Sequence, residues 1–238
     1  MALVLFVTGT LILTAFVAWA THRSAELLRQ GEVDFNLLLL PVENLVRIGL
    51  IVACLVLAWV SGLPWEQFGL TSTNLAADAA IGLALGLVLH GLLNALTNWA
   101  LRRFGPHIYS PVVILSILPD SRTEWVAVLL ALFPAVMVEE LLFRSLLLGG
   151  LAVWLPMLPL AIGTAILFGW MHSPQGQLAV VLTAAVSLVL SGLFLWRGSL
   201  LPCLVAHYGV NLLQLVVAYR QRDRLMVVDK SGQVNYTE

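Results

Sequence analysis

The most regular feature of the chain is a series of long apolar segments separated by short polar ones. A helix needs about 20 apolar residues to cross the hydrocarbon core of a bilayer, and seven segments approach or exceed that length. They are residues 3–20, 37–62, 79–101, 124 to about 151, 156–172, 177–195 and 200–219. The pattern predicts an all-α fold, a polytopic membrane helix bundle of about seven transmembrane helices.

Two segments need a separate interpretation. Residues 3–20 are long for the core of a signal peptide and follow no basic region, so we expect them to remain as the first membrane span. Residues 63–78 mix the aromatic Trp65 and Phe68 with polar residues such as Glu66. Such a mixture predicts a segment that lies along the membrane interface.

Composition supports a membrane protein and argues against two other classes. Of 238 residues, 60% are hydrophobic and 11% are charged, and the mean hydropathy is +0.96. Soluble domains carry about 25% charged residues, so the composition argues against a water-soluble fold. The net charge of -1, with no basic run, gives no surface for nucleic acid. Cys54 and Cys203 lie in apolar stretches, where we expect small buried hydrophobes and no disulfide.

The basic residues predict an orientation. Short loops rich in Lys and Arg stay in the cytoplasm. With seven spans, nine of the twelve Lys and Arg residues fall on one side: Arg23, Arg29, Arg102, Arg103, Arg122, Arg220, Arg222, Arg224 and Lys230. Arg197 falls on the other side, and Arg47 and Arg144 lie inside spans. We therefore predict an outside N-terminus and a cytoplasmic C-terminus. Eight tryptophans and one lysine suit a bacterial inner (cell) membrane.

The polar residues inside the last four spans are the candidates for chemistry. A charged side chain at the bilayer centre costs at least about 2.5 kcal/mol, so such residues usually face the interior of the bundle. They form three groups in the stretches EELLFR, FGWMH and HYGVN. Their members are Glu139, Glu140 and Arg144, then Phe168 and His172, then His207 and Asn211.

The first group predicts an ion pair and a separate acid. Glu140 and Arg144 are four residues apart with the acid first, which is the favourable order for a helical ion pair. We interpret this pair as support for helix packing. Glu139 is rotated from Glu140 by about 100° on a helix, so it points at a different neighbour.

The hairpin between the fourth and fifth spans predicts where that neighbour lies. Glu139 and His172 are each sixteen or seventeen residues from the break at residues 155–156. An antiparallel turn there brings them to one depth in the membrane. A glutamate beside a histidine in a cavity of low dielectric can share a proton and polarise a water, which is general-base chemistry.

The third group supplies hydrogen-bond donors. His207 and Asn211 are four residues apart and therefore share a helix face. As neutral donors they can hold the oxyanion that forms when water attacks a carbonyl. Phe168 precedes His172 by one helical turn and walls the same pocket.

Other polar pairs have a structural interpretation. His90 and Asn94 have the same spacing as the third group, but no acid accompanies them in that span, so we assign them to helix packing. Glu43 and Arg47 form a self-neutralised pair, with a role in lining the site as the less favoured interpretation. One pair of small residues predicts a close helix contact: Gly82 and Gly86.

In this order, the three motifs resemble the EExxxR, FxxxH and HxxxN patterns of the CAAX-protease and bacteriocin-processing family, which contains the type II CAAX prenyl endopeptidases and the Abi proteins. The resemblance covers roughly residues 124–219. It implies a glutamate-type intramembrane endopeptidase that needs no metal or other cofactor. It also implies roles for the motif residues: Glu139 and His172 activate water, His207 and Asn211 form the oxyanion hole, and Glu140, Arg144 and Phe168 give support.

This resemblance divides the expected single membrane domain of residues 1–238 into three parts. Residues 1–101 hold the N-terminal helices, 124–219 form the catalytic core, and 220–238 are a polar cytoplasmic tail. The expected partners are the lipid bilayer and a membrane-anchored protein or peptide substrate.

Two alternatives remain open from the sequence. A zinc peptidase would use the same residues as ligands, since two histidines and a glutamate form a recognised catalytic set. No HExxH helix is present, however. A non-catalytic membrane protein for immunity or transport would use the buried polar groups to carry a proton or hold a partner. The chain has no inverted repeat of the transporter type.

Overall fold

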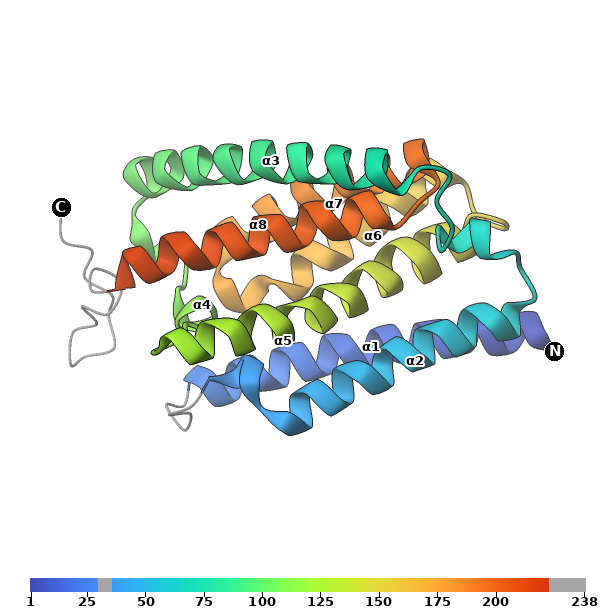
Figure 1. Cartoon of the computed structure of the whole chain (residues 1–238), viewed down its shortest axis with the longest axis horizontal. Helices are drawn as coiled ribbons and strands as arrows, with labels where there is room; N and C mark the ends of the chain where they lie inside the picture. Colours follow the sequence, from blue (N-terminus) through green and yellow to red (C-terminus); the bar gives the residue numbers. More distant parts are fainter. Residues whose placement is uncertain (30–35, 223–238) are drawn as a thin grey trace.

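The computed structural model describes residues 1–29 and 36–222, which form a bundle of helices (Figure 1). Within these residues, six helices are long and apolar enough to cross a membrane, and a seventh apolar helix is shorter. The predicted all-α bundle of about seven helices is confirmed. Its main helices are α1 (Ala2–Arg29), α2 (Pro41–Ser61), α3 (Leu75–Phe104), α5 (Arg122–Glu140) continued by η4 (Leu141–Gly150), α6 (Met157–Met171), α7 (Gln177–Arg197) and α8 (Leu201–Arg220).

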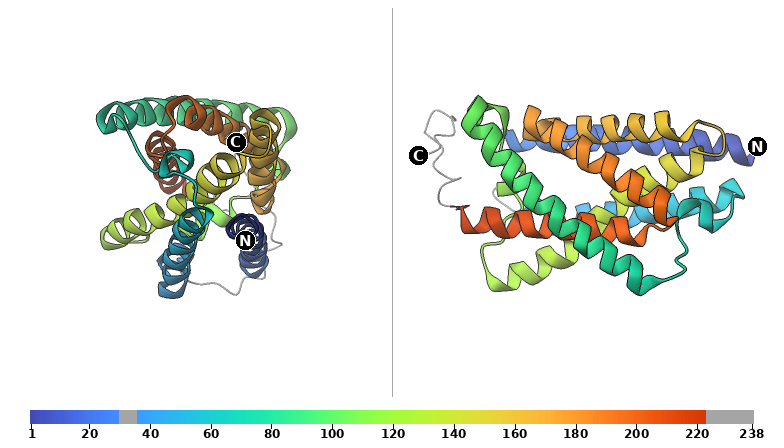
Figure 2. Two further views of the ribbon diagram at one scale, coloured as in Figure 1. Left: turned by 90° about the vertical axis from the view of Figure 1, so that its right-hand side faces the viewer. Right: turned by 90° about the horizontal axis from the view of Figure 1, so that it is seen from above.

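These helices run along the long axis of the molecule, and successive ones alternate in direction. Helices α1 and α2 lie together at one side, α3 crosses the opposite side over α8, and α5 runs between the two (Figures 1 and 2). Short helical turns occupy the connections: η1 (Leu37–Leu39), η2 (Trp65–Phe68), η3 (Pro106–Ile108), α4 (Val112–Leu115) and η5 (Ser173–Gln175). The orientation in the membrane stays a prediction, and two of its basic residues, Arg224 and Lys230, lie outside the described residues.

Local sequence explains where the helices begin and end. The Asn74 side chain accepts a hydrogen bond from the Ala77 amide at the start of α3, which satisfies a backbone donor that the helix itself leaves unpaired. Ser121 does the same for the Glu124 amide at the start of α5. Helix α2 ends at Gly62 with φ of 73°, a left-handed conformation that glycine adopts readily.

The segment predicted to lie along the interface is partly a core element. Trp65 is exposed, but the Phe68 ring is fully buried. The Ser145 hydroxyl donates to the Phe68 carbonyl over 2.7 Å, and the Gln67 amide donates to the Gly149 carbonyl over 2.8 Å. The Phe68 ring and the backbone of η2 therefore pack against η4, and the position of this segment at the membrane interface stays a prediction.

A close contact between α3 and α8 places the helix that carries His207. A Cβ atom at Gly82 would lie 2.5 Å from the Pro202 carbonyl oxygen, and one at Gly86 would lie 2.9 Å from that of Ala206. The predicted small-residue contact is therefore present. His90 and Asn94 are hydrogen-bonded to each other within α3, at 2.9 Å, in agreement with a role in packing.

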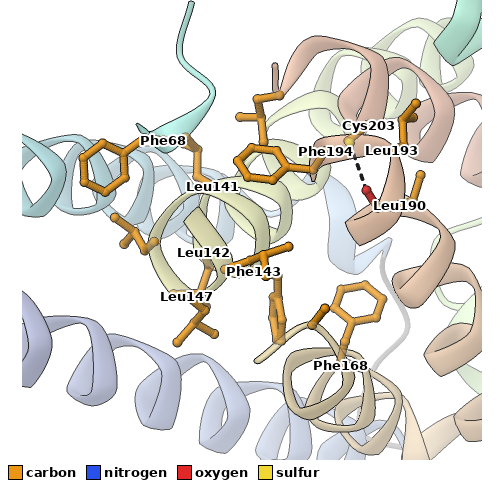
Figure 3. Packing of buried hydrophobic residues seen from close by; sticks show 14 of the residues in the cluster. Phe68, Leu141, Leu142, Phe143, Leu147, Phe168, Leu190, Leu193, Phe194 and Cys203 are labelled. Atoms are coloured by element: carbon orange, nitrogen blue, oxygen red, sulfur yellow. Dashed lines mark hydrogen bonds between the residues drawn. The ribbon is translucent and has the colours of Figure 1, made fainter. Parts of the chain in front are cut away.

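The centre of the bundle is the π-helical segment η4, all ten residues of which are buried. Leu141, Leu142 and Phe143 pack there against residues of α6, α7 and α8 (Figure 3). Such wide turns occur frequently at functional sites. Cys203 is a free, buried thiol of this core, as is Cys54, so the expectation of small buried hydrophobes is confirmed.

Candidate active site

Three parts of the chain meet around the buried ring of Phe168, near the end of α6. The ring centroid of His172 lies 4.7 Å from that of Phe168, and the ring centroid of His207, from α8, lies 5.9 Å from it. The guanidinium carbon of Arg144, from η4, lies 5.1 Å from the same centroid. The Phe143 ring, also from η4, packs edge-on against the Phe168 ring, with centroids 4.9 Å apart (Figure 3). One aromatic ring therefore fixes the separation of residues from all three motifs.

The predicted ion pair of Glu140 and Arg144 is present at the junction of α5 and η4. Both side chains are 0% exposed, and Arg144 Nη1 lies 3.0 Å from Glu140 Oε1. Arg144 Nη2 also donates to the Ser187 hydroxyl of α7 over 3.1 Å. The pair therefore ties the motif helix to its neighbour α7, and it keeps both charges compensated in the bundle interior.

His207 lies between the two glutamates. Its Nδ1 is 2.7 Å from Glu140 Oε1, and its Nε2 is 3.5 Å from Glu139 Oε2. Because a carboxylate paired with Arg144 can only accept, the hydrogen of this bond is on Nδ1. A neutral imidazole of that form has no hydrogen on Nε2. The predicted neutral oxyanion donor therefore does not fit this geometry, whereas an imidazolium has both hydrogens.

The acids of the cluster each have a basic neighbour. Arg144 contacts Glu140, and Arg47 is near enough to Glu139 for their charges to attract each other. Such compensation matters because uncompensated charge in the interior of a protein is costly. Glu140 also does more than support packing, because it fixes the tautomer and the orientation of His207.

Glu139 is the more open of the two acids, since 32% of its side chain is exposed. Within the described residues it forms no direct hydrogen bond or ion pair with His172. Arg47, on α2, is near enough for its charge and that of Glu139 to attract each other. Arg47 also lies 3.6 Å from Glu43, the expected partner in its own helix. Glu139 thus contacts one motif residue, His207, and part of its side chain is exposed.

His172 caps the end of α6. Its Nδ1 donates to the Phe168 carbonyl over 2.8 Å, because a carbonyl oxygen can only accept. In the neutral ring this leaves the lone pair of Nε2 free to accept a proton. Asn211 lies one turn after His207 on α8 and is half-buried.

Two features of the site were missed from sequence. The contact between Glu140 and His207 joins residues 67 positions apart, and no spacing rule reveals how two helices are rotated toward each other. His22, on α1, lies 3.0 Å from the hydroxyl of Ser173, the residue after His172. The position of His22 near the basic end of the first span does not indicate that it contacts the residue next to His172.

A zinc site would need at least three His, Cys, Asp or Glu side chains that converge on one point. Among residues 1–29 and 36–222, no group of three or more His, Cys, Asp or Glu side chains is arranged to hold a metal ion. The cluster combines two acids with a guanidinium and an imidazole.

Comparison with known families supports the motif assignment. Residues 121–213 match the family model described as Type II CAAX prenyl endopeptidase Rce1-like. The matched range contains all three motifs and begins at Ser121, the cap of α5. No curated protein and no solved structure matches the chain. The resemblance to the CAAX-protease family is confirmed, and with the apolar helices it indicates a multi-pass membrane protein of the peptidase class.

Proposed function

We propose that the chain is a glutamate-type intramembrane endopeptidase, which hydrolyses a peptide bond of a membrane-anchored protein or peptide without a metal ion. The observation that carries this proposal is the position of the His207 ring. It lies between Glu139 and Glu140 and shares the Phe168 ring with His172 as a neighbour. The Rce1-like match over the same helices supports the reaction class.

Water activation is assigned to Glu139 and His172. A water between them donates one hydrogen bond to the free Nε2 of His172 and gives its other proton to the Glu139 carboxylate. Its oxygen attacks the carbonyl carbon of the substrate and forms a tetrahedral oxyanion. General-base catalysis of this kind contributes about 10²–10⁴-fold to a rate. The exposed side of Glu139 supports this role, because an acid that binds water needs an accessible oxygen.

Oxyanion stabilisation is assigned to His207 and Asn211. The Nε2–H of the His207 imidazolium and the side-chain amide of Asn211 donate to the oxyanion. Glu140 holds the other nitrogen of the ring, so the donor is oriented before the substrate arrives. Removal of one such donor typically costs about 10²–10³-fold in kcat.

The second half of the reaction returns the proton. The C–N bond breaks as the tetrahedral intermediate collapses, and protonated Glu139 gives its proton to the departing nitrogen. The products are a carboxylic acid and an amine, and Glu139 is again a carboxylate. The acid then passes the remaining water proton to the amine, which gives a carboxylate and an ammonium group. In this proposal the substrate enters sideways from the bilayer, between helices. The membrane is the bacterial inner membrane, and the ends of the helices that carry the basic residues face the cytoplasm.

The proposal is tested by comparing the termini of membrane proteins in cells that produce the wild-type chain or its Glu139→Gln variant. New termini are expected only with the wild-type chain. Glu43→Gln is the matched control, because Glu43 is an acid on α2 that the proposed reaction does not use. Identical termini with the wild-type and Glu139→Gln chains would contradict the proposal. Cleavage that purified protein loses to a chelator and regains with zinc would contradict its metal-independent form.

A further inference from the structure

Helix α1 contacts the end of α6 at Trp170 and Ser173, which are close in sequence to the proposed base His172. His22 Nδ1 donates to the Ala18 carbonyl of its own helix over 2.9 Å. This bond places the hydrogen on Nδ1, so in the neutral ring Nε2 accepts. The Ser173 hydroxyl donates to that Nε2 over 3.0 Å. The imidazole also stacks on Trp170, with ring centroids 4.6 Å apart.

This contact is confined to one end of the two helices. Over the preceding turns an apolar groove of about 510 Å³ separates α1 from α6. It is lined by Leu11, Thr14, Ala15, Ala18, Trp19, His22, Leu167 and Trp170. His22 and Trp170 belong to this lining and also stack on each other, and His22 is bonded to Ser173, so these residues join α1 to the end of α6 beside the groove.

The same turn of α6 presents His172 to the opposite side. Phe168 packs on both His172 and His207, while Trp170, two residues away from Phe168 and from His172, packs on His22. Helix α6 ends at Met171, and His172 is already its cap. Residues at a helix end fray unless other contacts hold them. The Ser173 bond to α1 is such a contact, and it is one residue from the proposed base.

We propose that His22 is a positioning residue for His172, acting through its hydrogen bond to Ser173. This inference rests on the proposed function for its kinetic consequence. His22 lies on α1, outside the residues that match the family model. Misplacing a catalytic group by 1 Å can cost on the order of 100-fold in rate, so one hydrogen bond at the adjacent residue matters for kcat more than for KM.

Two variants remove this bond from its two sides. His22→Phe keeps a ring over Trp170 but has no acceptor, and Ser173→Ala removes the donor. Each is expected to lower kcat about tenfold or more with less than a twofold change in KM, within the range for a misplaced catalytic group. The double variant is expected to lose no more than either single one, because both remove the same interaction. His22→Gln is expected to recover part of the loss, since its amide oxygen can accept from Ser173.

A second readout does not need peptidase activity. The rate at which diethyl pyrocarbonate modifies His172, mapped by mass spectrometry, reports the exposure and orientation of its Nε2. It should change at least twofold in His22→Phe and Ser173→Ala. Thr21→Ala is the control, because among residues 1–29 and 36–222 the exposed Thr21 hydroxyl bonds only to the Val17 carbonyl of its own helix. No activity in the wild-type chain would refute the proposed function, and the His172 reactivity would still decide this inference. Unchanged reactivity of His172 in both variants would overturn it.

Discussion

His207 donates its Nδ1 hydrogen to Glu140 across 2.7 Å, and the same carboxylate oxygen lies 3.0 Å from Arg144 Nη1. The second acid of the first motif therefore links a buried guanidinium to the imidazole of the third motif. This arrangement resembles the way a buried carboxylate orients a catalytic histidine in other hydrolases. It makes Glu140 a positioning residue in our account, whereas Glu139 is the acid proposed to touch water.

Loss of the Glu140 charge is the first test of this arrangement. Glu140→Gln leaves the guanidinium of Arg144 without a carboxylate in a site where both side chains are 0% exposed. Breaking a buried pair from one side typically costs about 3–5 kcal/mol. We expect a loss of this size in the free energy of unfolding, measured by denaturant titration in detergent micelles.

The chain offers a matched control for that measurement. Glu43 and Arg47 are also an acid and an arginine four residues apart, but their atoms are 3.6 Å apart and the Glu43 side chain is 40% exposed. An exposed pair contributes about 0–1 kcal/mol, so Glu43→Gln should have little effect on stability. Equal losses in the two variants would show that burial of the Glu140 pair has no special importance.

The sequence predicted the helices well but not how they face each other. Apolar length located all seven main helices, and the spacing of Glu140 and Arg144 predicted their ion pair, because both depend on contacts within one segment. The bond from His207 to Glu140 depends on the rotation of α8 against α5, which local spacing does not determine. Nothing in Trp65–Phe68 indicates that the Phe68 ring is buried against η4, because that contact depends on a segment far away in the sequence.

The π-helical form of η4 could not be predicted from the sequence either. Its sequence, LLFRSLLLGG, is that of an ordinary apolar helix. Contacts from other elements, such as the bond from Gln67 to the Gly149 carbonyl, accompany the wider turns. Glu139 was predicted to meet His172, and both lie at the site, but the direct contact of Glu139 is with His207. The roles of these residues stay predictions until activity is measured.

Replacement of the central aromatic ring should affect catalysis more than folding. Phe168→Leu removes the surface that His172, His207 and Arg144 share, while it keeps an apolar side chain in the core. We expect kcat to fall about tenfold or more, as for other misplaced catalytic groups. Phe133→Leu is the control, because that ring is 47% exposed on α5. Equal kcat values for the two variants would argue against a shared support.

The contact of α3 with α8 gives a test of how His207 is placed. Gly86→Ala puts a Cβ atom 2.9 Å from the Ala206 carbonyl oxygen and 3.2 Å from its Cα atom. Because both are backbone atoms, α8 must shift, and overpacking of this kind costs about 1–3 kcal/mol. We expect a matching loss of stability in detergent and a lower kcat, since His207 follows Ala206.

A second glycine on the same helix is the control for that variant. A Cβ atom at Gly91 meets nothing within 4 Å. Alanine is favoured over glycine in a helix by about 0.8–1.0 kcal/mol, so Gly91→Ala should leave stability unchanged or raise it. If Gly86→Ala were as stable and as active as Gly91→Ala, the close approach of α3 would not determine the position of His207.

The central claim is that Glu139 takes a proton from the attacking water without help from a metal. Its most direct test is kcat of the Glu139→Gln variant, purified with chelator, on a substrate identified from the terminal comparison in cells. Glutamine keeps the size of the side chain but cannot accept that proton, so we predict a fall in kcat of about 10²-fold or more with unfolding behaviour like that of the wild-type chain. A folded Glu139→Gln protein with kcat within twofold of wild type would contradict the account.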